Sequence, residues 1–216
     1  MNIAFDCDET ILDTTAALRA HYLARHPGAV IPENTYSSRW DVFGRGAAAV
    51  AGWKEFIGKF QVSDDFMKIP PLPGAVDAIR RLKGDGHNLF VLSNASDDPN
   101  VCVQRAAHLE NVLGAGVINR VVCIESFESK KEKLAQLCAD VLVDDGCKNI
   151  GDAIDMGIHA ILLKGKENAE FVNMVQTSDD KDFAQSFWNY DFPKLRAHAK
   201  VANGWPDVVK IVQGLS

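Results

Sequence analysis

The sequence lacks a disulfide framework and a strong positive charge. Its 216 residues include five cysteines, an odd number without a CxxC pair, so the pattern predicts neither a set of disulfides nor a zinc ribbon. Free thiols are typical of a reducing compartment. The formal net charge is −6, which argues against a broad surface for polymeric nucleic acid. A local positive site for one small phosphorylated molecule stays compatible with this charge.

Long apolar runs are also missing. No run approaches the length that is needed to cross a bilayer, so we expect no membrane partner. The segment from Met1 to Asp6 reaches a charge too early for the apolar part of a signal peptide. We therefore expect a cytoplasmic protein, while its oligomeric state stays open. With 47% hydrophobic and 24% charged residues, a chain of this length can bury a core without disulfides or metal ions.

What the sequence does contain is an alternation of short apolar runs and helical periodicity. Between the runs, residues 75–83 and 131–139 place apolar side chains on one face of a helix. Runs of Val, Ile and Leu that are bounded by polar residues or glycine are typical of strands buried on both faces. These runs are residues 3–5, 88–92, 120–124, 140–143 and 159–163. The alternation predicts an α/β fold with a doubly wound, Rossmann-like parallel sheet.

Residues 14–68 interrupt this alternation, and no strand pattern occurs in them. Their helix-like segments are residues 14–25 and 47–60. We expect a small helical cap inserted after the first strand, with residues 1–13 and 69–216 as the core domain. Residues 165–205 show no clear period, and they could complete the substrate pocket or form a dimer contact.

Four polar clusters lie close to the predicted strands. Each alone has an ordinary explanation as a turn, a helix cap or a solvated pair of lysines. Their order along the chain is more informative, because ligands of such folds bind where the carboxyl ends of the strands meet. The clusters are Asp6 with Asp8 and Thr10, Ser93 with Asn94, Lys130 with Lys131, and Asp144 with Asp145.

The residue types of these clusters suit a metal ion and a phosphate. Carboxylates next to a buried strand are costly unless a positive group compensates their charge. Magnesium prefers such oxygen ligands, so we expect Mg²⁺ as the cofactor. A hydroxyl with nearby backbone N–H groups can hold phosphate oxygens, and a lysine can neutralise a phosphoryl group. The ordered set predicts one active site in the crevice of the sheet.

In their order and residue types, the four clusters resemble the motifs of the haloacid-dehalogenase-like hydrolases. The resemblance implies a phosphohydrolase in which Asp6 is the nucleophile and forms an aspartyl-phosphate. It also implies that Asp8 is the general acid and base, with its backbone carbonyl on magnesium. Ser93 would bind the phosphate, and Lys130 would stabilise its charge. The neighbouring Lys131 stays an alternative for that role.

A closer resemblance is to the 5'(3')-deoxyribonucleotidase branch of that family. It rests on residues 71–76, 143–145 and 202–205, and on the helical insertion. The resemblance implies a nucleoside monophosphate as the substrate. A phosphatase of a sugar phosphate or another small metabolite is the alternative, because Thr10 and Asn94 differ from the pattern of that branch.

Other residues are expected to complete the site. By the same resemblance, Asp144 and Asp145 would finish the metal site, with Asp145 favoured as the direct ligand. Trp40 could equally belong to a small cap core, and Arg45 to a solvated face. The expected substrate contacts are Thr10, Asn94 and Lys131 in the core, and Trp40 and Arg45 in the cap.

Two other classes of function fit the sequence less well. A phospho-receiver module also combines an acidic pair, a phosphorylated aspartate and a lysine on a parallel sheet. Here, however, Asp6 follows the first strand and a large insertion comes next. A non-catalytic binding protein on this fold would not need all four clusters.

Overall fold

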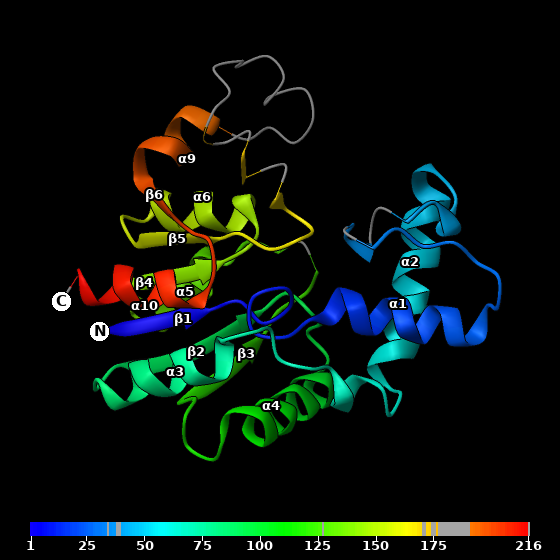
Figure 1. The fold of residues 1–216 in the computed structure, drawn as a ribbon, viewed down its shortest axis with the longest axis horizontal. Coiled ribbons are helices and arrows are strands. Elements are labelled where there is room, and N and C mark those ends of the chain that lie inside the picture. The colour runs from blue at the N-terminus through cyan, green and yellow to red at the C-terminus, as the bar shows by residue number, and fades with distance from the viewer. Residues whose placement is uncertain are drawn as a thin grey trace.

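The protein is built around a parallel sheet with helices on both faces (Figure 1). The computed structural model describes residues 1–33, 35–37, 40–126, 128–169, 172, 173, 176 and 191–215. Within these residues six strands pair in the order β3-β2-β1-β4-β5-β6, and every pairing is parallel. This arrangement confirms the predicted doubly wound α/β fold. The strands are β1 (Asn2–Phe5), β2 (Asn88–Ser93), β3 (Arg120–Cys123), β4 (Val141–Asp144), β5 (His159–Leu163) and β6 (Ala199–Ala202).

Five strands coincide with the apolar runs of the sequence, whereas the sequence does not predict β6. Residues 199–202 read Ala-Lys-Val-Ala, and this composition does not indicate a buried strand. The strand forms because it pairs with β5 at the edge of the sheet, from Ala160↔Ala199 to Leu163↔Ala202. Residues 177–190, for which the sequence suggested a pocket or dimer contact, lie outside the described residues.

Successive strand residues point to opposite faces, and each face is covered by its own helices. Phe5 and Val91 pack on one face, and Ala4 and Leu92 pack on the other. The helices of the first face are α3 (Ala75–Gly84), α4 (Pro99–Leu113) and α10 (Trp205–Gln213). Those of the second face are α5 (Lys131–Gln136), α6 (Cys147–Asp155) and α9 (Phe192–His198). In β1 to β5 the polar residues therefore lie at the strand ends.

Helix α4 carries clear signals at both of its ends. The Asp98 side chain accepts a hydrogen bond from the Asn100 N–H at 2.8 Å, and Pro99 opens the first turn. A cap of this kind stabilises a helix by about 1 kcal/mol. Gly114 follows the helix at φ 100°, a conformation that favours glycine. These ends fix the rotation of α4 against the sheet, and with it the position of Arg105.

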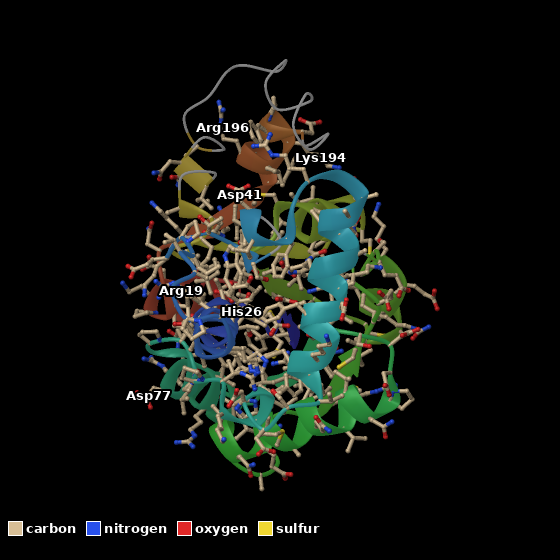
Figure 2. The ribbon with its side chains drawn as sticks, turned by 90° about the vertical axis from the view of Figure 1, so that its right-hand side faces the viewer. Arg19, His26, Asp41, Asp77, Lys194 and Arg196 are labelled. Carbon is tan, nitrogen blue, oxygen red and sulfur yellow. The ribbon has the colours of Figure 1, made fainter. Side chains whose placement is uncertain are left out.

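Residues 14–68 form a helical segment beyond the carboxyl ends of the strands (Figure 1). Figure 2 views the molecule from this side, with α1 and α2 in front of the sheet. The described part of this segment contains no strand. Of the described helices, none is long and apolar enough to cross a membrane, and the longest, α2, has 16 residues. The elements are α1 (Thr14–Arg25), η2 (Asp41–Phe43), α2 (Gly46–Gln61) and η3 (Phe66–Lys68).

The two linkers that join this helical segment to the sheet lie side by side. The Leu72 N–H donates to the Ile11 carbonyl at 2.8 Å, and the Asp13 N–H donates to the Pro70 carbonyl at 2.9 Å. Gly74 then turns the chain into α3 at φ 82°, where a side chain would be strained. The chain therefore leaves and re-enters the core at one place.

Candidate active site

Three carboxylates meet where β1 and β4 end. Asp6 follows β1, Asp144 is the last residue of β4, and Asp145 comes next. Because β1 and β4 are neighbours in register, with Phe5 opposite Val143, these residues arrive at the same point of the sheet edge. Oxygen atoms of the three carboxylates lie within 4.8 Å of one another, and all three residues are buried. Three buried like charges at this spacing require positive compensation.

Lys130 supplies part of that compensation. Its Nζ atom donates to Asp6 Oδ1 at 2.5 Å and to Asp144 Oδ2 at 2.7 Å, and the residue is fully buried. Burial alone would lower the pKa of Lys130, but the charges of Asp144 and Asp6 raise it above its ordinary value. The side chain is therefore an ammonium group, and one positive charge faces three acidic groups.

The remaining negative charge fits a divalent cation. Burial raises the pKa of Asp6 well above its ordinary value; Lys130 opposes this shift, and the neighbouring carboxylates add to it. Burial, together with the charge of Asp144, raises the pKa of Asp145 to about 7. A buried donor set made only of oxygen atoms, with negative charge in excess, is what Mg²⁺ prefers. A cation would restore the ionised form of both groups.

The two members of the acidic pair differ in how the protein holds them. Asp144 is fully buried, and both of its carboxylate oxygens accept hydrogen bonds from the protein. Asp145 accepts hydrogen bonds from the hydroxyl groups of Thr10, at 3.3 Å, and of Tyr36. Asp145 also lines the cavity described below. The donors to Asp144 are the Gly146 N–H at 2.7 Å, the Asn149 amide at 3.0 Å and Lys130 at 2.7 Å. Asp145 is thus the more available of the two for a ligand.

Asp8 is held by three donors from three different elements. Its Oδ1 atom accepts from the Thr14 hydroxyl at 2.5 Å and from Arg105 Nη2 at 2.8 Å. Within the described part of the chain, its Oδ2 atom accepts only from the Ser93 hydroxyl, at the longer distance of 3.3 Å. The carboxylate is therefore fixed in orientation, with Oδ2 as its less saturated oxygen.

Arg105 is the residue that sequence reasoning missed. It lies on α4, is 1% exposed, and its guanidinium carbon lies 4.5 Å from the centre of the Phe66 ring. Its Nε and Nη1 atoms are buried without a hydrogen-bond partner among the described residues. A buried guanidinium is costly unless it is paired, and Asp8 is its partner. A signal was available, because Arg105 falls on the apolar stripe of its helix, four residues after Val101 and four before Leu109.

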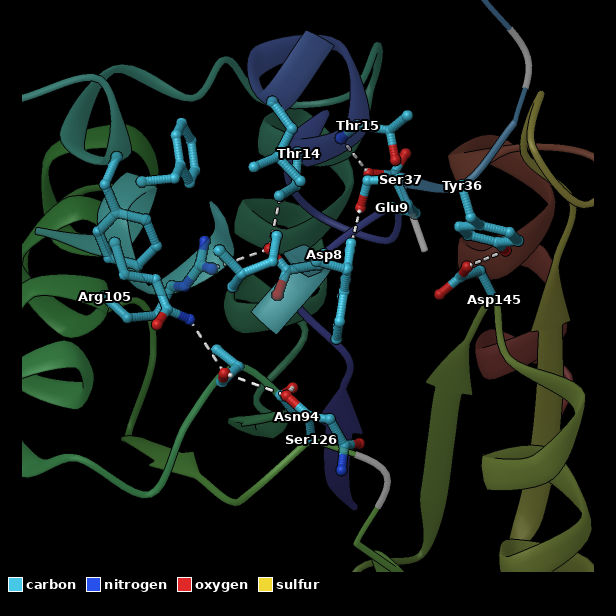
Figure 3. A pocket seen from close by; sticks show the side chains of 17 residues that line it. Asp8, Glu9, Thr14, Thr15, Tyr36, Ser37, Asn94, Arg105, Ser126 and Asp145 are labelled. Carbon is cyan, nitrogen blue, oxygen red and sulfur yellow. Dashed lines mark hydrogen bonds and ion pairs between the residues drawn. The ribbon is translucent and has the colours of Figure 1, made fainter. Parts of the chain in front are cut away.

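A cavity of about 220 Å³ opens above Asp8 and Asp145 (Figure 3). Its polar floor comes from the core, and its apolar wall comes mainly from the helical segment. Asn94, an expected substrate contact, is among the residues that line it, and its side-chain amide donates to the carbonyls of Glu125 and Glu128 at 3.2 and 3.1 Å. The wall consists of Leu18, Trp53, Ile57, Phe60 and Phe66.

Other expected substrate contacts lie elsewhere. Thr10 is fully buried and contacts Asp145. Lys131 donates to Asp155 at 2.8 Å on the exposed side of α5. Trp40 is 2% exposed and lies in an aromatic cluster, 6.2 Å from Phe43 between ring centroids. Arg45 is exposed at the start of α2. None of these four residues lines the cavity.

The chain is similar to known proteins in its sequence and in its fold. A sequence model of the haloacid dehalogenase-like hydrolases matches residues 1–160. No curated protein matches the chain. Similar folds occur in a haloacid dehalogenase-like hydrolase from Streptococcus pneumoniae, with 14% identity, a TM-score of 0.61 and 98% of each chain covered. An L-2-haloacid dehalogenase from Xanthobacter autotrophicus, with chloropropionic acid covalently bound, is 15% identical over the whole of both chains with a TM-score of 0.58. A predicted phosphoglycolate phosphatase from Haemophilus somnus is 14% identical, with a TM-score of 0.54 and 98% of this chain and 97% of that chain covered.

Proposed function

The chain belongs to the haloacid dehalogenase-like hydrolases, and from this premise we propose that it is a magnesium-dependent phosphomonoester hydrolase that works through an aspartyl-phosphate on Asp6. The observation that carries the proposal is Asp8, fixed beside the cavity by Thr14, Ser93 and Arg105. A halide leaves as a stable anion, whereas the oxygen of an ester needs a proton to leave easily. A positioned carboxyl group two residues after the nucleophile therefore favours ester hydrolysis over dehalogenation.

Asp6, Asp145 and the backbone carbonyl of Asp8 would hold the magnesium ion, with Asp144 behind them. When bound, the ion would offset the negative charge of the phosphate and of the carboxylates. Lys130 contributes to the same balance, because its ammonium group already contacts Asp6 at 2.5 Å. The charge of this set makes an anionic nucleophile compatible with an anionic substrate.

The proposed reaction has two displacements. The Asp6 carboxylate attacks phosphorus, the bond to the leaving oxygen breaks, and Asp8 donates a proton to that oxygen. Asp8, now a carboxylate, then accepts a proton from a water molecule that attacks the same phosphorus, which releases phosphate and restores Asp6. Oδ2 of Asp8 is the oxygen for both transfers, because Oδ1 already accepts from Thr14 and Arg105. Ser93 and Lys130 would orient and stabilise the phosphoryl group.

The size and lining of the cavity indicate which class of substrate fits it. A volume of about 220 Å³ lies below the roughly 300–1,000 Å³ of most small-molecule sites. This favours a compact phosphate ester with a small apolar portion, which Leu18, Trp53 and Ile57 would contact. A nucleoside monophosphate, which the sequence resemblance implies, would extend beyond this cavity.

A substrate panel tests the function and the substrate class together. We expect phosphate release from compact phosphate esters in the presence of Mg²⁺, and a loss of roughly 100-fold or more with EDTA, since the carboxylates would then lack their counter-charge. The panel contains p-nitrophenyl phosphate, phosphoglycolate, sugar phosphates, deoxynucleoside monophosphates and 2-chloropropionate. Release of chloride, or full activity in EDTA, would contradict the proposed reaction. The highest kcat/KM on a nucleotide would instead support the nucleotidase alternative.

Replacing Arg105 tests whether it positions Asp8. Arg105→Met removes a charged hydrogen bond of the kind that contributes about 1.5–3 kcal/mol, so we expect kcat to fall about 10- to 100-fold. KM should change less than kcat, because Arg105, although it lines the cavity, donates its hydrogen bond to Asp8. Arg105→Lys should recover part of the loss. The matched control is Arg81→Met, at an exposed position of α3 remote from the site. An unchanged kcat in a folded Arg105→Met protein would exclude this role.

A further inference from the structure

A second group of three carboxylates lies outside the set that the proposed reaction uses. Glu9 follows β1, Asp13 is the residue before α1, and Glu167 follows β5. Oxygen atoms of their carboxylates lie within 4.8 Å of one another. Glu9 and Asp13 lie on the loop between β1 and α1, Glu167 lies on the loop after β5, and the group shares no member with that of Asp6, Asp144 and Asp145.

Glu9 is the anchor of this second group. The residue is 5% exposed, and its backbone adopts φ 57°, in the left-handed region. Its Oε1 atom accepts a hydrogen bond from the Thr15 N–H at 2.5 Å (Figure 3). Its Oε2 atom is buried and has no hydrogen-bond partner among the described residues. Burying a carboxylate oxygen away from water without a hydrogen-bond donor costs several kcal/mol, unless a cation or a proton compensates its charge.

The protein itself supplies no compensating side chain within the described ranges. Across those residues, no lysine or arginine forms an ion pair with Glu9, Asp13 or Glu167. Among the described residues, the Asp13 side chain accepts only the weak capping bond from the Ala16 N–H, at 3.3 Å. The group is thus poorly satisfied as it stands, and its donor atoms are all oxygen.

We propose that Glu9, Asp13 and Glu167 form a second binding site for a hard divalent cation, Ca²⁺ or Mg²⁺. Oxygen-only donors from flexible carboxylates suit this class of ion. An ion here would join the loop after β5 to the start of α1. That loop also carries Asn168, whose amide donates to the Asp145 carbonyl at 2.9 Å and to the Leu163 carbonyl at 3.0 Å. The second ion would therefore stabilise the backbone at Asp145 and the start of the helical segment.

Calorimetric titration with CaCl₂ and with MgCl₂ tests the proposal without any measurement of activity. We expect the wild-type protein to bind two equivalents of cation. Glu167→Gln and Asp13→Asn should each lose one equivalent or weaken it at least tenfold, because each removes a charge and keeps the shape of the side chain. Asp145→Asn should weaken the other equivalent and keep the second. Glu132→Gln is the matched control, because Glu132 is exposed on α5.

The possible outcomes distinguish the second cation site from the proposed phosphatase activity. One equivalent in the wild type, and none in Asp145→Asn, would overturn the second site even if the enzyme proves to be a magnesium-dependent phosphatase. Two equivalents, one of them sensitive to Glu167→Gln, would support the site even if no substrate is found. Should a variant fail to fold by circular dichroism, the stoichiometry of the wild type after dialysis against each cation still decides between one site and two.

Discussion

Asp6→Asn should abolish turnover of every phosphate ester that the wild-type enzyme hydrolyses. Asparagine keeps the size of the side chain and an acceptor for Lys130, but its amide cannot form the aspartyl-phosphate. We expect kcat to fall by roughly 10⁴-fold or more, as for other residues that form the covalent bond. The assay is phosphate release at saturating Mg²⁺ with the best ester of the panel.

The same variant separates chemistry from folding. Asparagine removes one of three like charges that lie within 4.8 Å, so the thermal midpoint without Mg²⁺ should not decrease. The matched control is Asp77→Asn, because Asp77 is exposed in the first turn of α3. Wild-type turnover by a folded Asp6→Asn protein would rule out the covalent mechanism.

The variants Lys130→Met and Lys131→Met should differ strongly in kcat and in stability. Lys130 contacts two buried carboxylates, at 2.5 and 2.7 Å, so its loss should lower kcat by about 10³-fold. Removing one partner of a buried ion pair also costs about 3–5 kcal/mol of stability. Lys131 and Asp155 are each 43% exposed and screened by solvent, so Lys131→Met should leave both the thermal midpoint and kcat nearly unchanged.

Steady-state kinetics and thermal melts of both lysine variants make this comparison. If Lys130→Met does not fold, Lys130→Gln at saturating Mg²⁺ replaces it, because glutamine can still donate to Asp6. A larger loss of kcat in Lys131→Met than in the Lys130 variants would reverse the assignment of the two lysines.

The sheet and the acidic centre could be predicted because both follow from local patterns. Strands that are buried on both faces consist of continuous apolar runs. Residues Val141–Val143 of β4, which lies between β1 and β5, are an example. Polar residues directly after such runs meet at one sheet edge whatever the rest of the fold does. This argument predicts that Asp6 and Asp144 meet, and in the structure Lys130, from the start of α5, contacts both of them.

The helical segment and Arg105 show where local patterns fail. The position of Trp40 depends on packing against Phe43 and Phe56, which no spacing in the sequence specifies. Arg105 belongs to no motif, and its role depends on a tertiary contact with Asp8, 97 residues earlier. The group of Glu9 and Glu167 likewise forms only when the loop after β5 folds back toward β1. Such contacts depend on the three-dimensional arrangement; the place of Arg105 on the apolar stripe of α4 indicates that it is buried but does not identify its partner.

The paired linkers have a consequence for how such an enzyme changes its substrate. Leu72 and Asp13 each form a backbone hydrogen bond across the two linkers, so both ends of the intervening chain are anchored at a single point of the core. Insertions, deletions or exchanges between these points leave the strand register unchanged, provided that Thr14 and Tyr36, which donate to Asp8 and Asp145, are kept or replaced by equivalent donors. Evolution, or an engineer, can therefore graft a different recognition module here while the strands that carry the reaction centre are inherited.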